Sequence, residues 1–99
     1  MNRLVLQATL VERGAPRYTP AGLPALDCSL KHESQLTEAG HARRASLEIK
    51  AVAIGETSSV LQSMALGSEA SFAGFLTAQR NGRGIVFHVT DIASLSHPD

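Results

Sequence analysis

The sequence predicts an all-β domain, a small barrel of five strands with one short helix between the third and the fourth. Two observations carry this prediction. Five runs of the chain place apolar residues at every second position, which is typical of strands with one buried face. Only residues 56–66 place them at helical spacing instead. Because 99 residues is near the common size of one domain, we expect a single domain over residues 1–95 and a flexible tail over residues 96–99.

The first predicted strand covers residues 2–12, because every second residue over 4–10 is apolar. Three prolines and two glycines interrupt regular structure over residues 12–24, so we expect a loop there. A second alternating run over residues 26–33 predicts the second strand. Cys28 falls on its apolar face and is expected to be a small buried hydrophobe.

Residues 34–44 are polar and contain Gly40, which leaves two alternatives open, a connecting loop or an extended hairpin tip. The third predicted strand covers residues 45–54 and ends at Gly55. Lys50 points away from its apolar face. We therefore expect Lys50 on the outer surface of the barrel.

One helix is predicted, over residues 56–66. Thr and Ser residues at 57–59 offer N-caps, and Gly67 is expected at the C-cap. At about ten residues this helix is too short to form a layer of its own. We expect it to plug one end of the barrel.

The last two strands form a predicted hairpin. Apolar residues alternate over residues 70–76 and again over residues 85–89. Between them, Asn81-Gly82 supplies the positive φ angles that a tight hairpin turn needs. This hairpin is therefore expected to be a rigid projection with a short tip.

Five strands with a helix after the third follow the order of the oligonucleotide/oligosaccharide-binding fold, or OB-fold, a five-stranded Greek-key barrel. Barrels of this kind bind nucleic acid on one face and with their loops. The fold prediction therefore directs attention to cationic side chains on loops and on one sheet face.

Positive and negative charges balance over the whole chain. Nine Lys and Arg residues match nine Asp and Glu residues, so the chain has no global basic field of the kind that marks a nucleic-acid binder. Such a site must then come from local clustering. Six arginines occur in pairs close in sequence, namely Arg13 with Arg17, Arg43 with Arg44, and Arg80 with Arg83.

Motifs of the common enzyme classes are missing from the sequence, so we expect no enzyme and no cofactor. It has no GxSxG elbow, Walker loop or HExxH pattern, and its four histidines lack metal-ligand spacing. The first ten residues are too short and too interrupted by polar residues for a signal peptide or a membrane span. A single cysteine excludes an intrachain disulfide and fits a reducing compartment. We therefore expect a cytoplasmic protein without a membrane partner.

Short stretches over nearly the whole chain resemble the bacterial single-stranded DNA-binding protein family. They include Asn2-Arg3-Leu4-Val5-Leu6, the alternation around Cys28, Ala53-Ile54-Gly55, and the run from Leu66 to Leu76. Other stretches resemble a short branch of that family, namely Pro20-Ala-Gly-Leu-Pro24, Leu30-Lys-His32, Glu38-Ala-Gly40 and Gly74-Phe75. The resemblance implies an OB-fold homodimer that binds single-stranded DNA and joins a restart helicase and other primosome proteins in replication restart.

The resemblance also selects residues for the binding face. Arg43 matches a cationic position of the family, and Arg17 keeps the charge of another. Where better-known members carry a tryptophan and a phenylalanine, this chain has Ser46 and His41. Base stacking is worth about 1–3 kcal/mol per base, so we expect a weaker and largely electrostatic binder. The candidate nucleic-acid-binding residues are Arg13, Arg17, Tyr18, Arg43, Arg44, Lys50, Arg80 and Arg83.

Two functions remain in competition at this stage. The first is a single-stranded DNA-binding component of the replication restart primosome that binds through basic residues and assists the restart helicase. The alternative is a homodimeric protein–protein adaptor of the primosome with weak or vestigial DNA binding, which the missing aromatic platforms favour. Phe75 faces the side of its strand opposite to that of Phe72, which is the outer surface. Phe75 is therefore either a dimer contact or a platform for stacking a base.

Overall fold

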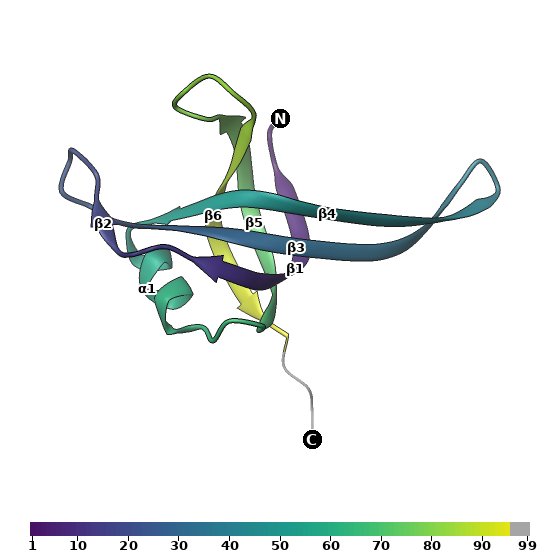
Figure 1. Cartoon of the computed structure of the whole chain (residues 1–99), viewed down its shortest axis with the longest axis horizontal. Helices are drawn as coiled ribbons and strands as arrows, with labels where there is room; N and C mark the ends of the chain where they lie inside the picture. The colour runs from purple at the N-terminus through teal and green to yellow at the C-terminus, as the bar shows by residue number, and fades with distance from the viewer. Residues whose placement is uncertain (96–99) are drawn as a thin grey trace.

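The computed structural model describes residues 1–95, so the expected tail, residues 96–99, lies outside the described residues. Its elements are β1 Leu4–Arg13, β2 Arg17–Tyr18, β3 Pro24–Glu38, β4 His41–Ile54, α1 Glu56–Ser63, β5 Glu69–Ala78 and β6 Ile85–Ser94. Five long strands, with a helix between the third and fourth of them, follow the predicted order (Figure 1). No helix within residues 1–95 is long and apolar enough to span a membrane.

The five long strands close into a barrel. In order around it, β1 pairs with β5, β5 with β6, β6 with β4, β4 with β3, and β3 again with β1. All of these pairs are antiparallel except β4 with β6, which is parallel. The OB-fold barrel predicted from the sequence is therefore confirmed.

The element β2 corrects the prediction of an unbroken loop over residues 12–24. Two residues of this segment pair with β3, Arg17 opposite Ala25 and Tyr18 opposite Pro24. Their pairing extends the sheet beyond the barrel at the edge of β3. It also holds the Arg17 side chain at a fixed place beside that strand.

The strands β3 and β4 form a hairpin much longer than the barrel needs. Their register runs without a break from Ala25 opposite Ile54 to Glu38 opposite His41. Of the two alternatives for residues 34–44, the extended hairpin tip is correct. The turn is made by Ala39 and Gly40, both at positive φ. Figure 1 shows this hairpin, which we call the arm, projecting well beyond the barrel.

The helix α1 is shorter than predicted and is capped differently. Its N-cap is Gly55, at φ 80°, without a side-chain hydrogen bond, and its C-cap is Met64 rather than Gly67. The residues at 57–59 therefore do not act as N-caps, and Ser58 instead donates its hydroxyl to the Gly55 carbonyl at 2.6 Å. Gly55 can adopt this backbone conformation because it has no Cβ. The sharp turn lets α1 fold back against β3, β4 and β6.

Apolar side chains from all five long strands and from α1 fill the barrel. Phe72 is fully buried, as predicted, and Leu6, Ile49 and Leu76 pack partly buried against the same core. The largest fully buried apolar side chains are Phe72, Phe87, Leu10, Leu26, Leu30 and Leu61. This core orients the outward side chains of β3, β4 and β6 because successive residues in a strand face opposite ways.

The connection between β5 and β6 is wider than the tight turn expected at Asn81-Gly82. It spans residues 79–84, and the Gln79 amide donates to the Gly84 carbonyl at 3.1 Å. Gly82 has the expected positive φ, at 75°, whereas Asn81 does not. The tip is therefore a loop of six residues, which carries Arg80 and Arg83 further from the barrel.

Candidate nucleic-acid interface

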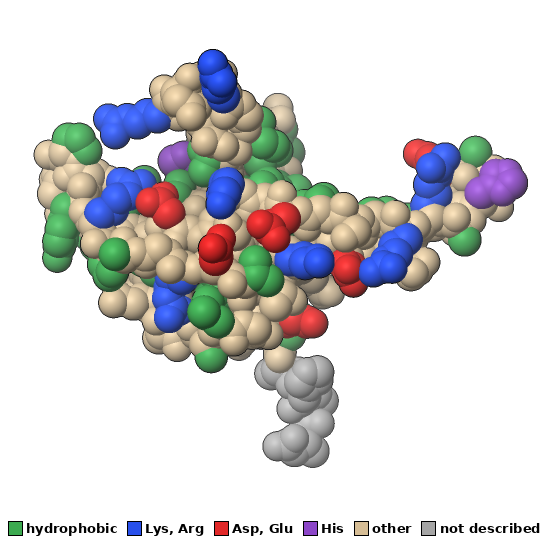
Figure 2. All heavy atoms as spheres, in the orientation of Figure 1, with side chains coloured by type: hydrophobic (Ala, Val, Ile, Leu, Met, Phe, Trp, Pro, Cys, Tyr) green, Lys and Arg blue, Asp and Glu red, His purple; other side chains and the backbone are tan. Residues whose placement is uncertain are grey.

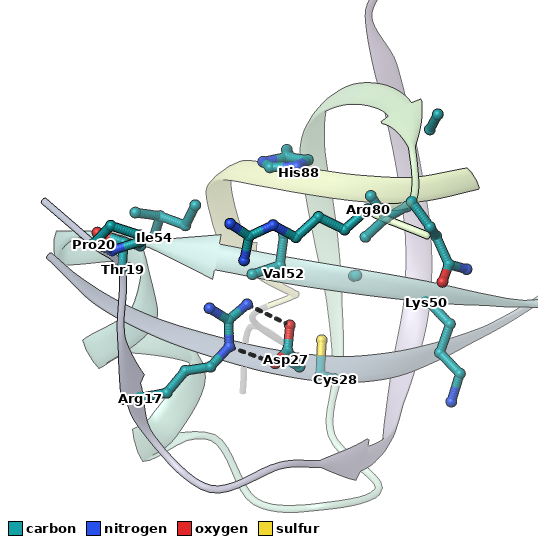
Figure 3. A pocket seen from close by; sticks show the side chains of 14 residues that line it. Arg17, Thr19, Pro20, Asp27, Cys28, Lys50, Val52, Ile54, Arg80 and His88 are labelled. Carbon is teal, nitrogen blue, oxygen red and sulfur yellow. Dashed lines mark hydrogen bonds and ion pairs between the residues drawn. The ribbon is translucent and has the colours of Figure 1, made fainter. Parts of the chain in front are cut away.

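A groove of about 560 Å³ crosses the outer face of the barrel (Figure 3). One wall is β2 with the residues that follow it, and the other is the β5–β6 loop. The floor is made by β3, β4 and β6. OB-folds bind oligonucleotides on the face of their second and third strands, here β3 and β4, between these two loops. The groove is therefore where the fold places a nucleic-acid site.

Three side chains in one transverse row form the floor. Asp27 on β3 lies opposite Val52 on β4, and Val52 lies opposite His88 on β6. The row continues to Phe75 on β5, whose ring stacks on the His88 imidazole with centroids 4.8 Å apart and planes 12° apart. Val52 points outward but is only 5% exposed. Thus Val52 is part of the groove floor and not free apolar surface.

Arg17 on β2 and Asp27 on β3 form a bidentate ion pair at the side of the groove. The Arg17 Nε donates to Asp27 Oδ2 at 2.8 Å and its Nη2 donates to Oδ1 at 3.0 Å. The hydrogen bond and the charge of Asp27 raise the pKa of the Arg17 guanidinium above its usual value. Arg17 therefore lines the groove as a cation that is already neutralised.

Lys50 and Arg80 bring two further cations to the groove. The Lys50 Nζ donates to the Ser29 hydroxyl at 3.2 Å. Arg80 belongs to the β5–β6 loop, and Figure 3 shows its guanidinium pointing into the groove near Val52. Arg83, on the same loop, is exposed. Within residues 1–95, neither loop arginine has an ion-pair partner.

Arg13 serves the fold and does not line the main groove. Its guanidinium donates to the carbonyl oxygens of Leu61, at 3.3 Å, and Met64. These carbonyls end α1, where the helix dipole favours a cation. The sequence pairing of Arg13 with Arg17 therefore does not correspond to a shared site.

Arg43 and Arg44 point to opposite sides of the arm because they are adjacent on β4. Arg44 shares its side with Ser46 and Lys50, which is the groove side. Each arginine has a carboxylate partner across the hairpin. The Arg43 Nε is 2.8 Å from Glu38, and the Arg44 Nη2 is 2.9 Å from Glu33. In Figure 2 cationic and acidic side chains accordingly lie next to one another on the arm.

Tyr18 is 74% exposed on β2 and is not among the residues that line the groove. Cys28 lines it from below and is buried, as the sequence predicted. Burial, followed by the Asp27 charge, raises the pKa of its thiol to about 12. The thiol is therefore neutral at physiological pH and behaves as an apolar side chain.

Sequence reasoning missed Asp27, Ser29 and His88, which contact or line the cationic groove. Alternation put Asp27 on the outer side of its strand, and this was the only available signal. That Arg17 would lie against it depends on β2 pairing with β3. No group of His, Cys, Asp and Glu side chains suited to a metal ion occurs in the described part of the chain.

By fold and by the position of its groove, the molecule is an OB-fold barrel of the oligonucleotide-binding class. Residues 2–91 match the model of a family described as "Another single-strand binding protein family". The replication restart protein PriB of Bordetella pertussis is 51% identical over 80 residues, covering 81% of this chain and 75% of that protein. The structure of PriB from Ralstonia solanacearum superposes with a TM-score of 0.88 at 41% identity, covering 97% of this chain and 99% of that one.

A more distant similarity extends to the SSB domain of a Synechococcus protein, with a TM-score of 0.70 at 25% identity over 94% of both chains. The chain belongs to the single-strand binding protein family and, within it, to the replication restart proteins PriB, also called primosomal replication protein N. This confirms the family resemblance seen in the sequence motifs.

Proposed function

We propose that this protein binds single-stranded DNA in the groove and acts in replication restart. The observation that carries the proposal is the convergence of Arg17, Lys50 and Arg80 on one groove of an OB-fold barrel. Relatives named as replication restart proteins support the biological role. As part of this proposal the protein works in the cytoplasm, where its one cysteine, the free and buried Cys28, would stay reduced.

The groove side chains favour contact with phosphates over reading of bases. Arginine and lysine neutralise the DNA backbone without distinguishing sequence. Ser46, on the groove side of β4, offers no ring for a base, and the chain contains no tryptophan. The stacked rings of Phe75 and His88 lie at the far end of the floor. We therefore expect sequence-independent binding whose affinity falls steeply with salt.

Changing Arg80 and Arg83 together to alanine is expected to weaken binding strongly. A plot of the logarithm of the binding constant against the logarithm of the salt concentration becomes shallower by about 0.7 for each phosphate contact that is lost. Loss of two contacts therefore weakens binding by about 50-fold at about 50 mM salt. These arginines have no carboxylate partner within residues 1–95, so their charge is available to DNA. Fluorescence anisotropy of a labelled oligothymidylate at about 50 and 150 mM salt measures both quantities.

Arg43→Ala is the matched control for this experiment. It also removes one arginine charge, but from the side of the arm opposite Lys50. We expect a change of less than about twofold at 150 mM salt, where charges further apart than about 8 Å are screened. If Arg43→Ala weakened binding and the double variant did not, the proposed face would be the wrong one.

The adaptor is retained as a second candidate because three exposed arginines are already paired with carboxylates. In that case the parent protein binds DNA weakly or only vestigially at about 50 mM salt, and the Arg80/Arg83 double variant stimulates the restart helicase as well as the parent does. If the protein instead acts by binding single-stranded DNA, the double variant loses both DNA binding and stimulation of the helicase. Comparing helicase unwinding rates with both proteins therefore separates the candidates.

We propose further that the functional unit is a homodimer formed through β1. Residues 4–8 pair with β5 on one side, whereas pairing with β3 begins only at Thr9, so a short strand edge is unpaired within residues 1–95. Val5 on this edge is 57% exposed. Beside it lies an apolar depression that includes Leu4, Leu6 and Leu47. A second copy would cover both the edge and the depression.

Val5→Glu is expected to convert a dimer of twice the 10.5 kDa chain mass into a monomer at micromolar concentration. Burying an unpaired carboxylate in such a contact costs more than the contact gains. Sedimentation velocity measures the change. Val60→Glu is the control, because Val60 is similarly exposed, at 45%, but lies on α1. A parent protein that sediments as a monomer would contradict this assembly.

A further inference from the structure

Asp27 is the single carboxylate among the residues that line the groove in the described part of the chain. It stands on β3, beside the β2 wall, at one end of the row that continues to Val52 and His88. Around it lie Arg17, Lys50 and Arg80. A negative charge at this position opposes the binding of a polyanion, so its presence needs a physical account.

The contact with Asp27 occupies the part of Arg17 that DNA would use. A guanidinium grips a phosphate through two parallel N–H donors on one edge. In this structure Nε and Nη2, which form one such edge, donate to the two carboxylate oxygens at 2.8 and 3.0 Å. A phosphate must therefore displace the Asp27 carboxylate or bind the remaining donors beside a like charge.

Folding gives little reason for this ion pair. The Arg17 and Asp27 side chains are 47% and 55% exposed, so solvent screens their attraction, and even with two hydrogen bonds the pair adds only modestly to stability. The backbone at Asp27 is held independently, because its carbonyl accepts the Gly14 amide at 2.8 Å and the residue pairs with Val52. The main physical consequence of the pair is therefore to neutralise one cation of the groove.

We propose that Asp27 limits the affinity of the groove for single-stranded DNA by holding Arg17 in an internal ion pair. The inference rests on the proposed function, since it concerns the same groove. Without bound DNA, Lys50 and Arg80 line the groove with no ion-pair partner within residues 1–95, whereas the charge of Arg17 is neutralised by Asp27. The protein then holds DNA by one phosphate contact fewer than its arginines would allow.

The test is a set of variants in the same anisotropy titration with labelled oligothymidylate. Asp27→Asn is expected to bind about five- to tenfold more tightly at about 50 mM salt and to steepen the log–log salt slope by about 0.7, as one added phosphate contact would. The Arg17→Ala/Asp27→Asn double variant is expected to lose that gain and the steeper slope. Circular dichroism and thermal melting establish that each variant is folded.

Glu69→Gln is the matched control, because it removes one exposed carboxylate that does not line the groove. We expect it to change affinity by less than about twofold at 150 mM salt. If the parent binds and Asp27→Asn gains no more than Glu69→Gln, the inference fails while the proposed function stands. A gain that persists in the double variant also overturns it, because Asp27 would then repel DNA directly. If neither the parent nor Asp27→Asn binds at low salt, both proposals fail.

Discussion

Replacing Phe72 with alanine is expected to lower the free energy of unfolding by about 3–5 kcal/mol. Phe72 is fully buried on β5, where it lies opposite Leu6 of β1 and Ile92 of β6. Removing the ring would leave a cavity bounded by three strands of a closed barrel. Such a barrel has little freedom to collapse around the space. Urea denaturation followed by circular dichroism, at one fixed protein concentration, measures the loss.

Phe75→Ala is the control for Phe72→Ala, because the same ring is removed from the same strand. Phe75 lies on the outer side and is 38% exposed. Its loss is expected to cost about 1 kcal/mol, since less apolar surface returns to water. Equal losses in the two variants would mean that the two faces of β5 are not assigned correctly.

Gly74→Ala is expected to destabilise the protein by about 3 kcal/mol or more, at the upper end of the cost of overpacking. A Cβ at this position would lie 1.8 Å from the His88 carbonyl oxygen. The obstacle is backbone and cannot rotate away. It lies at a register shift, where Ala73 opposes Asp91 and Gly74 opposes Val89. The β5–β6 pairing must therefore move to admit a methyl group.

Gly14→Ala provides the comparison for Gly74→Ala. Its added Cβ would meet the Asp27 carbonyl oxygen at 3.5 Å, which is an ordinary contact. We expect a change within about 0.5 kcal/mol, as for most surface substitutions. Thermal melting of both variants measures the difference. A Gly74→Ala protein as stable as Gly14→Ala would contradict the close approach of β5 to β6.

Strand order and the core were accessible from the sequence because both depend on local patterns. Alternating apolar residues mark each long strand, and the same alternation places Phe72, Leu30 and Leu10 inside. The period of two also put Lys50 and Phe75 on the outer face. Short motifs, such as Asn2-Arg3-Leu4-Val5-Leu6, carried the family resemblance.

Features that depend on pairing between distant segments were beyond this reading. Residues 34–38 are polar apart from Leu36, which is exposed, so they have no buried face and nothing local distinguishes a strand of the arm from a loop. The N-cap of α1 is Gly55 because the turn from β4 needs a positive φ at that position, although residues with better capping side chains follow it. Likewise β2 is only two residues long and exists because β3 is beside it.

The arginines show where local pattern ends and tertiary structure takes over. The residues alone indicated an OB-fold barrel of the single-strand binding family, with its cations in three sequence pairs. Folding separates two of these three pairs, whereas Arg80 and Arg83 stay on one loop: Arg13 binds the end of α1, and Arg17 lies against Asp27. Arg43 and Arg44 leave opposite sides of one strand. Neighbours in sequence diverge because strand side chains alternate, and distant residues meet because the barrel closes on itself.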